Sequence, residues 1–162
     1  MKKTVTALAA ALLLCGCARA RGDRQEPVKL PEDMQTQCVF TVDDRSYEAQ
    51  VERRGPDLWQ WEFTAPETLE GLSMTVSGDT VRLGLEELSW SQEREGIPES
   101  SPVILIDGAL DALIAGRGIE CIRQGDILVE TGESGGNELR AELKGGKLLK
   151  IEIDGWITAE FS

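Results

Sequence analysis

Alternation of apolar and polar residues begins near residue 35 and continues through most of the chain. In one such stretch Trp59, Trp61 and Phe63 alternate with Gln60 and Glu62. This period of two places alternate side chains on opposite faces of a β-strand, so that one face is apolar and the other polar. A chain with this pattern is expected to fold into antiparallel strands that bury only one face of their sheet.

Short turn sequences separate the alternating stretches, and they predict hairpins between neighbouring strands. Such turns are found at residues 43–45, 55–57, 78–79, 125–126, 145–146 and 154–155. About nine or ten strands are expected from the alternating stretches along the chain. A single sheet of that size must twist and curl, and its concave apolar face then needs a cover.

The alternation stops at Ser101, where a helix is predicted. Ser101 is placed as the N-cap and Pro102 at the first helical position, and residues 103–115 are mostly apolar. Gly108 disfavours a helix by about 1 kcal/mol relative to alanine, so a start at Asp107 is the alternative. We therefore predict a mainly β (α+β) fold, a curved antiparallel half-barrel sheet with one or two helices over its concave face.

Composition narrows the function classes. The 162 residues include 17 Lys and Arg against 29 Asp and Glu, a formal net charge of −12, and no histidine. An acidic surface repels phosphate backbones, so no nucleic acid partner is expected. Without histidine the usual catalytic triads and most catalytic zinc sites are excluded. We expect a protein that is not an enzyme, with no metal and no cofactor; a carboxylate-based envelope hydrolase is the less favoured alternative.

The N-terminus has the pattern of an export signal. Lys2 and Lys3 precede an apolar run over residues 5–14, which is too short to span a bilayer. The run ends in Leu14-Cys15-Gly16-Cys17, which resembles the bacterial lipobox. A plain secretory or membrane segment with incidental cysteines is the alternative.

The lipobox resemblance implies a lipoprotein signal peptide over residues 1–16 and lipidation of Cys17 with palmitate-type chains. The protein would then sit on the extracytoplasmic face of the cell membrane, because two or three acyl chains make a durable anchor. Residues 17–34 are polar and contain two prolines, so they are interpreted as a tether linker. The folded domain is expected over residues 35–162.

Two cysteines remain in the predicted domain, Cys38 and Cys121. An exported protein permits a disulfide between them, which would join the first strand to the first strand after the helix. Two separate buried thiols are the alternative.

Apolar residues of the predicted sheet and helix could line a cavity for acyl chains or another apolar ligand, or they could fill the core. Trp90 lies among polar residues before the helix, where it would either contact a partner or pack at a strand end. The candidate cavity residues are Trp59, Trp61, Phe63, Leu83, Leu110 and Leu113.

Several segments carry a resemblance to a known family over roughly residues 36–161. They are Phe63-Thr64-Ala65-Pro66, Leu69-Glu70-Gly71-Leu72, Val76-Ser77-Gly78-Asp79, Gly125-Asp126 and Lys144-Gly145-Gly146-Lys147. Their layout resembles the LolA and LolB lipoprotein carriers, and most of all the lipid-anchored relatives of clostridial type that include the spore germination lipoprotein GerS.

The resemblance implies a LolA-like half-barrel that binds an apolar ligand such as a lipid, or an envelope protein partner such as a cell-wall enzyme. A lipid or lipoprotein carrier or acceptor is the alternative function. A tethered protein cannot shuttle freely, which favours binding over transport.

Overall fold

One continuous sheet organises residues 24–162, the part of the chain that this computed structural model describes. The predicted signal peptide and Cys17 lie outside the described residues. The first seven strands are β1 (Arg24–Gln25), β2 (Met34–Val42), β3 (Arg45–Arg53), β4 (Leu58–Ala65), β5 (Ser73–Ser77), β6 (Thr80–Leu85) and β7 (Leu88–Glu93). After the helix α1 (Pro102–Ala115) come β8 (Glu120–Gln124), β9 (Ile127–Ser134), β10 (Asn137–Lys144), β11 (Lys147–Ile153) and β12 (Ile157–Phe161).

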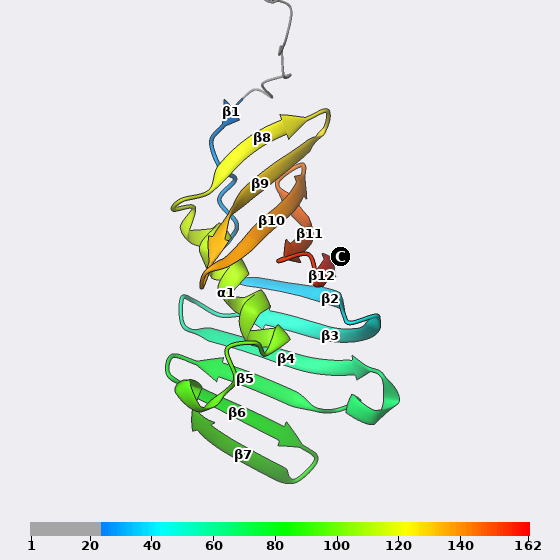
Figure 1. Cartoon of the computed structure of the whole chain (residues 1–162). Coiled ribbons are helices and arrows are strands. Elements are labelled where there is room, and N and C mark those ends of the chain that lie inside the picture. The colour runs from blue at the N-terminus through cyan, green and yellow to red at the C-terminus, as the bar shows by residue number, and fades with distance from the viewer. Residues whose placement is uncertain (1–23) are drawn as a thin grey trace, which may run out of the picture.

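The twelve strands are hydrogen-bonded in the order β1-β8-β9-β10-β11-β12-β2-β3-β4-β5-β6-β7. Every neighbouring pair is antiparallel. Two meanders therefore meet in the middle of the sheet, where β12 pairs with β2 and Phe161 lies opposite Cys38. The sheet is open and curved, with β1 at one end and β7 at the other (Figure 1).

The predicted turns have the backbone that two-residue hairpins need. Type I′ turns require positive φ at both central residues, a conformation that glycine and, less readily, aspartate accept. Gly145 and Gly146 have φ of 59° and 83°, and Asp43 and Asp44 have φ of 48° and 64°. These residues fix the registers of β10 with β11 and of β2 with β3.

Helix α1 begins at Pro102 and ends at Ala115, followed by Gly116 in the left-handed conformation with φ of 62°. The alternative start at Asp107 is therefore wrong. Close packing accounts for a glycine at position 108 of the helix, because a Cβ there would lie 3.2 Å from the Ser134 hydroxyl of β9. Two short 3₁₀ helices, η1 (Glu67–Leu69) and η2 (Arg94–Gly96), complete the described fold.

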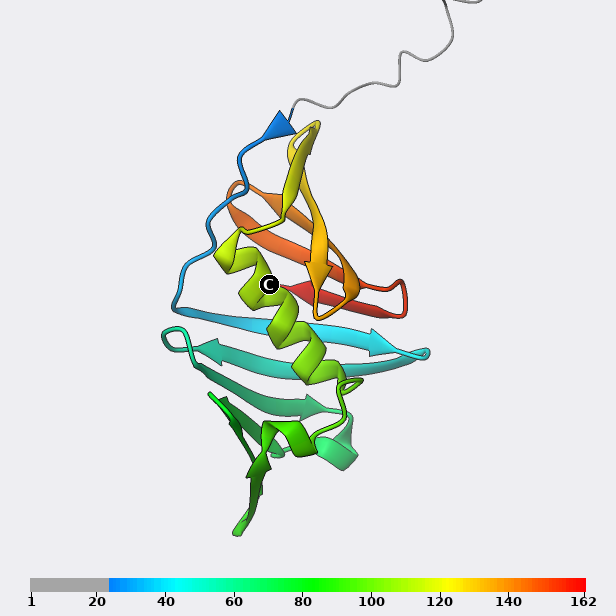
Figure 2. The ribbon, with the colours of Figure 1, turned by 60° about the vertical axis from the view of Figure 1, so that its left-hand side comes forward.

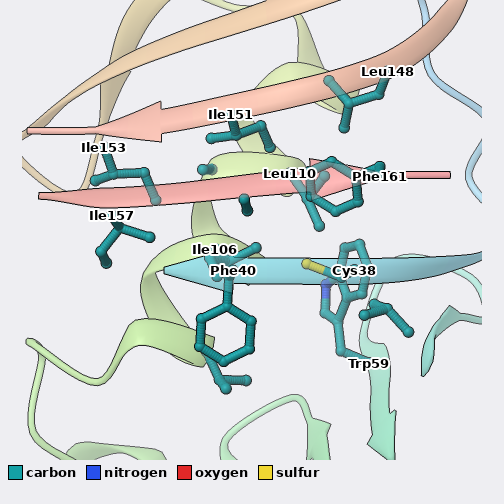
Figure 3. Close-up of a cluster of buried hydrophobic side chains, with 14 of the residues drawn as sticks. Cys38, Phe40, Trp59, Ile106, Leu110, Leu148, Ile151, Ile153, Ile157 and Phe161 are labelled. Atoms are coloured by element: carbon teal, nitrogen blue, oxygen red, sulfur yellow. The ribbon is translucent and has the colours of Figure 1, made fainter. Parts of the chain in front are cut away.

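The helix crosses the concave face of the sheet, as Figure 2 shows. Its inward side and the inward faces of the strands form one apolar core, part of which is drawn in Figure 3. The predicted architecture is confirmed: a curved, mostly antiparallel sheet with one helix in the described residues. The sheet has more strands than expected, since β1 and β7 were not predicted.

The structure differs from the prediction of a free tether up to residue 34. Gln25 pairs with Cys121 of β8, and the Val28 N–H donates to the Glu130 carboxylate at 2.6 Å. Leu30 is buried in the core. From Arg24 onward this segment is part of the folded domain. Its contacts are scattered single ones, some through the backbone and some through side chains such as Leu30, so the segment has no periodicity for sequence reasoning to detect.

Candidate functional site

The concave face under α1 is filled. Trp59, Trp61 and Phe63 of β4 and Leu110 and Leu113 of the helix are all buried in one core (Figure 3 labels Trp59 and Leu110). The structure thus brings these candidate cavity residues together by packing them against each other. With α1 in place, these side chains are covered by their neighbours and do not line an open cavity for a ligand. The sixth candidate, Leu83, lies apart on β6 and is half-buried.

Two tryptophan–aspartate hydrogen bonds hold the helix on the sheet. The Trp61 indole N–H donates to Asp107 Oδ1 at 2.8 Å, and the Trp59 indole N–H donates to Asp111 Oδ1 at 3.3 Å. The spacings match, because two residues of a strand and four residues of a helix both advance by about 6 to 7 Å. The bonds fix the position of α1 along β4 and its antiparallel direction.

Buried Arg53 joins three parts of the fold. Its guanidinium donates to Asp111 Oδ1 from Nε at 3.3 Å and from Nη2 at 3.2 Å. Its Nη1 donates to the Glu32 carbonyl of the N-terminal segment. The same group lies 5.4 Å from the ring centroid of Trp59, in cation–π contact. The arginine therefore ties residues 24–34 to β3, β4 and the helix.

Two buried carboxyl groups have perturbed acidity. Burial, helped by the nearby Asp111 charge, raises the pKa of Asp107 well above its usual value, and the Trp61 hydrogen bond and Arg94 only partly oppose this shift. Burial also raises the pKa of Glu130, against the hydrogen bond from Val28. Each carboxyl has one oxygen without a hydrogen-bond partner. Both groups lie inside the fold, and their contacts are structural.

Of the two alternatives for the cysteines, a disulfide and two separate buried thiols, the structure has the second. Cys38 of β2 and Cys121 of β8 are both free, buried thiols. Four strands, β9 to β12, stand between their strands in the sheet, whereas a disulfide needs Cα atoms within about 7 Å. Burial and the nearby Asp107 raise the pKa of Cys38 to about 12, so this thiol stays protonated and unreactive. Among residues 24–162 no group of three or more His, Cys, Asp or Glu is placed to hold a metal ion.

An apolar surface remains open at the far end of the concave face. Leu83 lies opposite Trp90 and Leu85 opposite Leu88 across β6 and β7, on the same face as the buried Val81. Leu88 is 76 % exposed, Trp90 48 % and Leu85 42 %. We call this surface the β7 shelf; its residues are Leu72, Leu83, Leu85, Leu88 and Trp90, and with Gly84 and Ser89 they line a shallow hollow of about 200 Å³.

Sequence reasoning did not place the β7 shelf. The sequence leaves Trp90 either exposed in a loop before the helix or packed at a strand end, and the structure places it in strand β7 with 48 % of its surface exposed. The signal was present but weak, because Leu88 and Trp90 are the only apolar residues of 87–93 that alternate with polar neighbours. The pairing of this strand with β6 decides which face these side chains share.

Two larger hollows have a different character. One of about 760 Å³ is lined largely by charged groups, including Glu133, Arg140 and Glu152. Another of about 620 Å³ lies beside the first half of α1 and mixes Ile104 and Trp156 with polar groups. The β7 shelf is smaller than either and is almost wholly apolar in its lining. No helix in the described part of the chain has the length and apolarity needed to cross a membrane.

Comparison with known proteins gives a likeness of fold only. No family model matches the chain, and no curated protein matches it. Among solved structures, a LolA superfamily protein from Nitrosomonas europaea is similar with a TM-score of 0.42 and 13 % identity, over 85 % of this chain and 87 % of that one. The superfamily of that protein is the one whose layout the sequence resembles.

The Trp61–Asp107 bond is expected to contribute measurably to stability. Trp61→Phe leaves the buried Asp107 with neither oxygen bonded, whereas Trp59→Phe leaves Asp111 with Arg53 and solvent, since Asp111 is 39 % exposed. Both changes remove the same volume from buried positions. We expect Trp61→Phe to lower the free energy of unfolding by about 1–2 kcal/mol more than Trp59→Phe does. Urea unfolding of the two variants measures this difference, and equal losses would contradict it.

Proposed function

We propose that this protein is a non-catalytic bacterial lipoprotein, held on the extracytoplasmic face of the cell membrane by lipid on Cys17, which binds a protein of the cell envelope. The observation that carries the proposal is the combination of a filled concave centre with an open apolar shelf at one end of the sheet. The buried carboxyl groups Asp107 and Glu130 have structural partners, which supports a binding role over a hydrolytic one. A cell-wall enzyme is one class of partner consistent with this location.

An apolar ligand or lipid cargo is the second candidate. It is disfavoured because the side chains that would line its cavity are packed against α1. The β7 shelf offers about 200 Å³, below the 300–1,000 Å³ or so of most small-molecule pockets. A carrier function would require α1 to leave the sheet and break both tryptophan–aspartate hydrogen bonds.

The geometry suits a partner that stands away from the membrane. Seven residue steps separate Cys17 from Arg24, the first residue of β1, and a chain of that length reaches at most about 25 Å. An anchor at Cys17 would therefore hold the β1 end of the sheet near the bilayer. Strand β7 lies at the opposite end of the sheet (Figure 1).

Lipidation is tested by Cys17→Ser in the native host. We expect this variant to lose incorporation of labelled palmitate and to leave the membrane fraction, because the thiol is the site of acylation and two or three chains supply the anchor. Cys15→Ser is the matched control and should remain labelled and membrane-bound. Persistence of label in the Cys17→Ser variant, or its loss in the Cys15→Ser variant, would contradict the assignment.

Binding is tested by native mass spectrometry of the protein released from its own membranes. The proposal expects a stoichiometric complex with one protein and no bound lipid other than the anchor. A lipid that co-purifies in fixed ratio without a protein partner would support the carrier instead.

A further inference from the structure

The β7 shelf and the edge of β7 together have the features of a site for an extended peptide. Strand β7 is hydrogen-bonded to β6 on one side and ends the sheet on the other. Alternate residues of such an edge strand turn their N–H and C=O groups outward, where an added strand can pair with them. The shelf lies directly beside this edge and offers apolar surface for alternate side chains of the added strand.

Natural proteins usually protect an edge strand with inward charges, prolines or a covering loop. The inward positions of β7 are instead Leu88, Trp90 and Gln92, which lie opposite Leu85, Leu83 and Val81 of β6. Leu88 is the most exposed large apolar side chain among the described residues, at 76 %. An edge that combines free backbone groups with exposed apolar side chains is suited to pairing.

The charge around the shelf selects the partner. Glu86 and Glu87 form the turn before β7, and Glu93 ends the strand. Glu67 and Glu70 precede Leu72 on the other side of the shelf, and all five carboxylates are exposed. Glu87 and Glu93 alternate with Leu88, Trp90 and Gln92, so they lie on the outer face of β7, which Arg82 of β6 shares because it pairs with Ser91. Against these five carboxylates stand only Arg82 and the half-buried Arg94 that follows Glu93. The rim is therefore acidic and complements lysine or arginine.

The same charges disfavour the two other occupants of an exposed edge. If the β7 strands of two copies paired antiparallel with Trp90 at the centre, Glu87 of each copy would lie opposite Glu93 of the other. Like charges directly opposite each other are destabilising. A membrane surface is anionic and would repel the rim. The end of the sheet nearest the proposed anchor is also β1 rather than β7.

We propose that β7 receives, by strand addition, an extended segment of an envelope protein that has alternating apolar side chains flanked by lysine or arginine. This inference rests on the proposed function and specifies its partner. The added strand would pair with the free edge of β7, place its apolar side chains on the shelf and set its basic residues beside Glu87 and Glu93.

The test uses fluorescently labelled synthetic peptides and the purified full chain, with binding followed by anisotropy. The probe is KKVTVTVKK, compared with EEVTVTVEE and with a form of the first peptide that is N-methylated at alternate residues. We expect the basic peptide to bind, more weakly as salt rises, and the acidic and N-methylated peptides to bind at least about tenfold more weakly.

Protein variants then locate the site. Trp90→Ala is expected to weaken binding of the basic peptide by about tenfold or more, because an exposed aromatic at the centre of a contact supplies much of its affinity. Trp156→Ala is the matched control, since Trp156 is also exposed, at 37 %, and lies outside the shelf. Both positions are exposed, and circular dichroism checks that each variant is folded.

Several outcomes would overturn the inference. Equal binding of the basic and acidic peptides, no binding of the basic peptide, or an equal effect of Trp156→Ala would each do so. A dimer of the full chain that Trp90→Ala abolishes would assign the edge to a second copy instead. If the native complex forms with the Trp90→Ala variant as well as with the unchanged protein, this inference fails and the proposed function stands; if no native complex forms at all, the proposed function fails.

Discussion

The protein is expected to lose stability as the pH rises above about 4, and Asp107→Asn is expected to remove most of that loss. In the unfolded chain this carboxyl titrates near 3.8, and in the fold burial raises its pKa well above that value. Between the two pKa values the native state binds more protons than the unfolded state, so the free energy of unfolding falls as the pH rises. One such group lowers it by up to about 1.4 kcal/mol per pH unit in this window.

The sign of the effect identifies its source. A raised carboxyl pKa gives stability that is fully present below the unfolded value of 3.8 and is lost as the pH rises through the folded value. Asparagine does not titrate but keeps an oxygen that accepts from the Trp61 indole, so the variant should be less sensitive to pH across this range. The charged neighbours Asp111 and Arg94 remain in both proteins.

Urea unfolding between pH 4.5 and 9, followed by tryptophan fluorescence, measures the slope. Glu130 titrates in the same direction, so Glu130→Gln is expected to remove the remaining part. Asp126→Asn is the control, because Asp126 is exposed and its pKa is lowered by Lys144, so it cannot produce a fall in stability with rising pH. A slope that is unchanged in the Asp107→Asn variant would show that this carboxyl is not the buried titrating group.

The sheet and helix could be predicted because they depend on local periodicity. Alternation in 59–63 placed β4, and the Ser101-Pro102 pair placed the start of α1. Turn chemistry at Gly145 and Gly146 set a register without any long-range information. These features need only neighbours within a few residues of each other.

Features that depend on distant partners were not predictable in the same way. The N-terminal segment is held by a hydrogen bond between Val28 and Glu130, which are far apart in the chain. The separation of Cys38 from Cys121 follows from the strand order, in which β12 returns to pair with β2. Spacing along the sequence does not reveal that order, so a disulfide between them could not be rejected beforehand.

The hydrogen bonds between the tryptophans and the helix aspartates could be predicted only in part. Asp107 and Asp111 stand four residues apart on a helix, and Trp59 and Trp61 stand two apart on a strand. These separations span similar lengths, so the sequence contained a matched set of donors and acceptors. What it lacked was the position of the helix over β4, which the hydrophobic core determines.

Leu110→Ala tests whether the concave face is a packed core or a site for cargo. Leu110 is fully buried among residues of the sheet and helix, so truncation to alanine leaves a cavity in addition to the lost apolar contact. We expect the free energy of unfolding to fall by about 2–5 kcal/mol. Leu105→Ala, on the half-buried side of α1, makes the same chemical change and should lose less than half as much.

The size of this loss in stability distinguishes a packed core, as in a protein-binding lipoprotein, from a face that opens for lipid, as in a carrier. A filled core is destabilised by the loss of one methine and two methyl carbons, because the neighbouring side chains relax only partly into the space. A face built to open for an acyl chain would tolerate the change, since the helix would already be weakly held. A loss below about 1 kcal/mol for Leu110→Ala, equal to that for Leu105→Ala, would therefore favour the lipid carrier over the protein-binding lipoprotein.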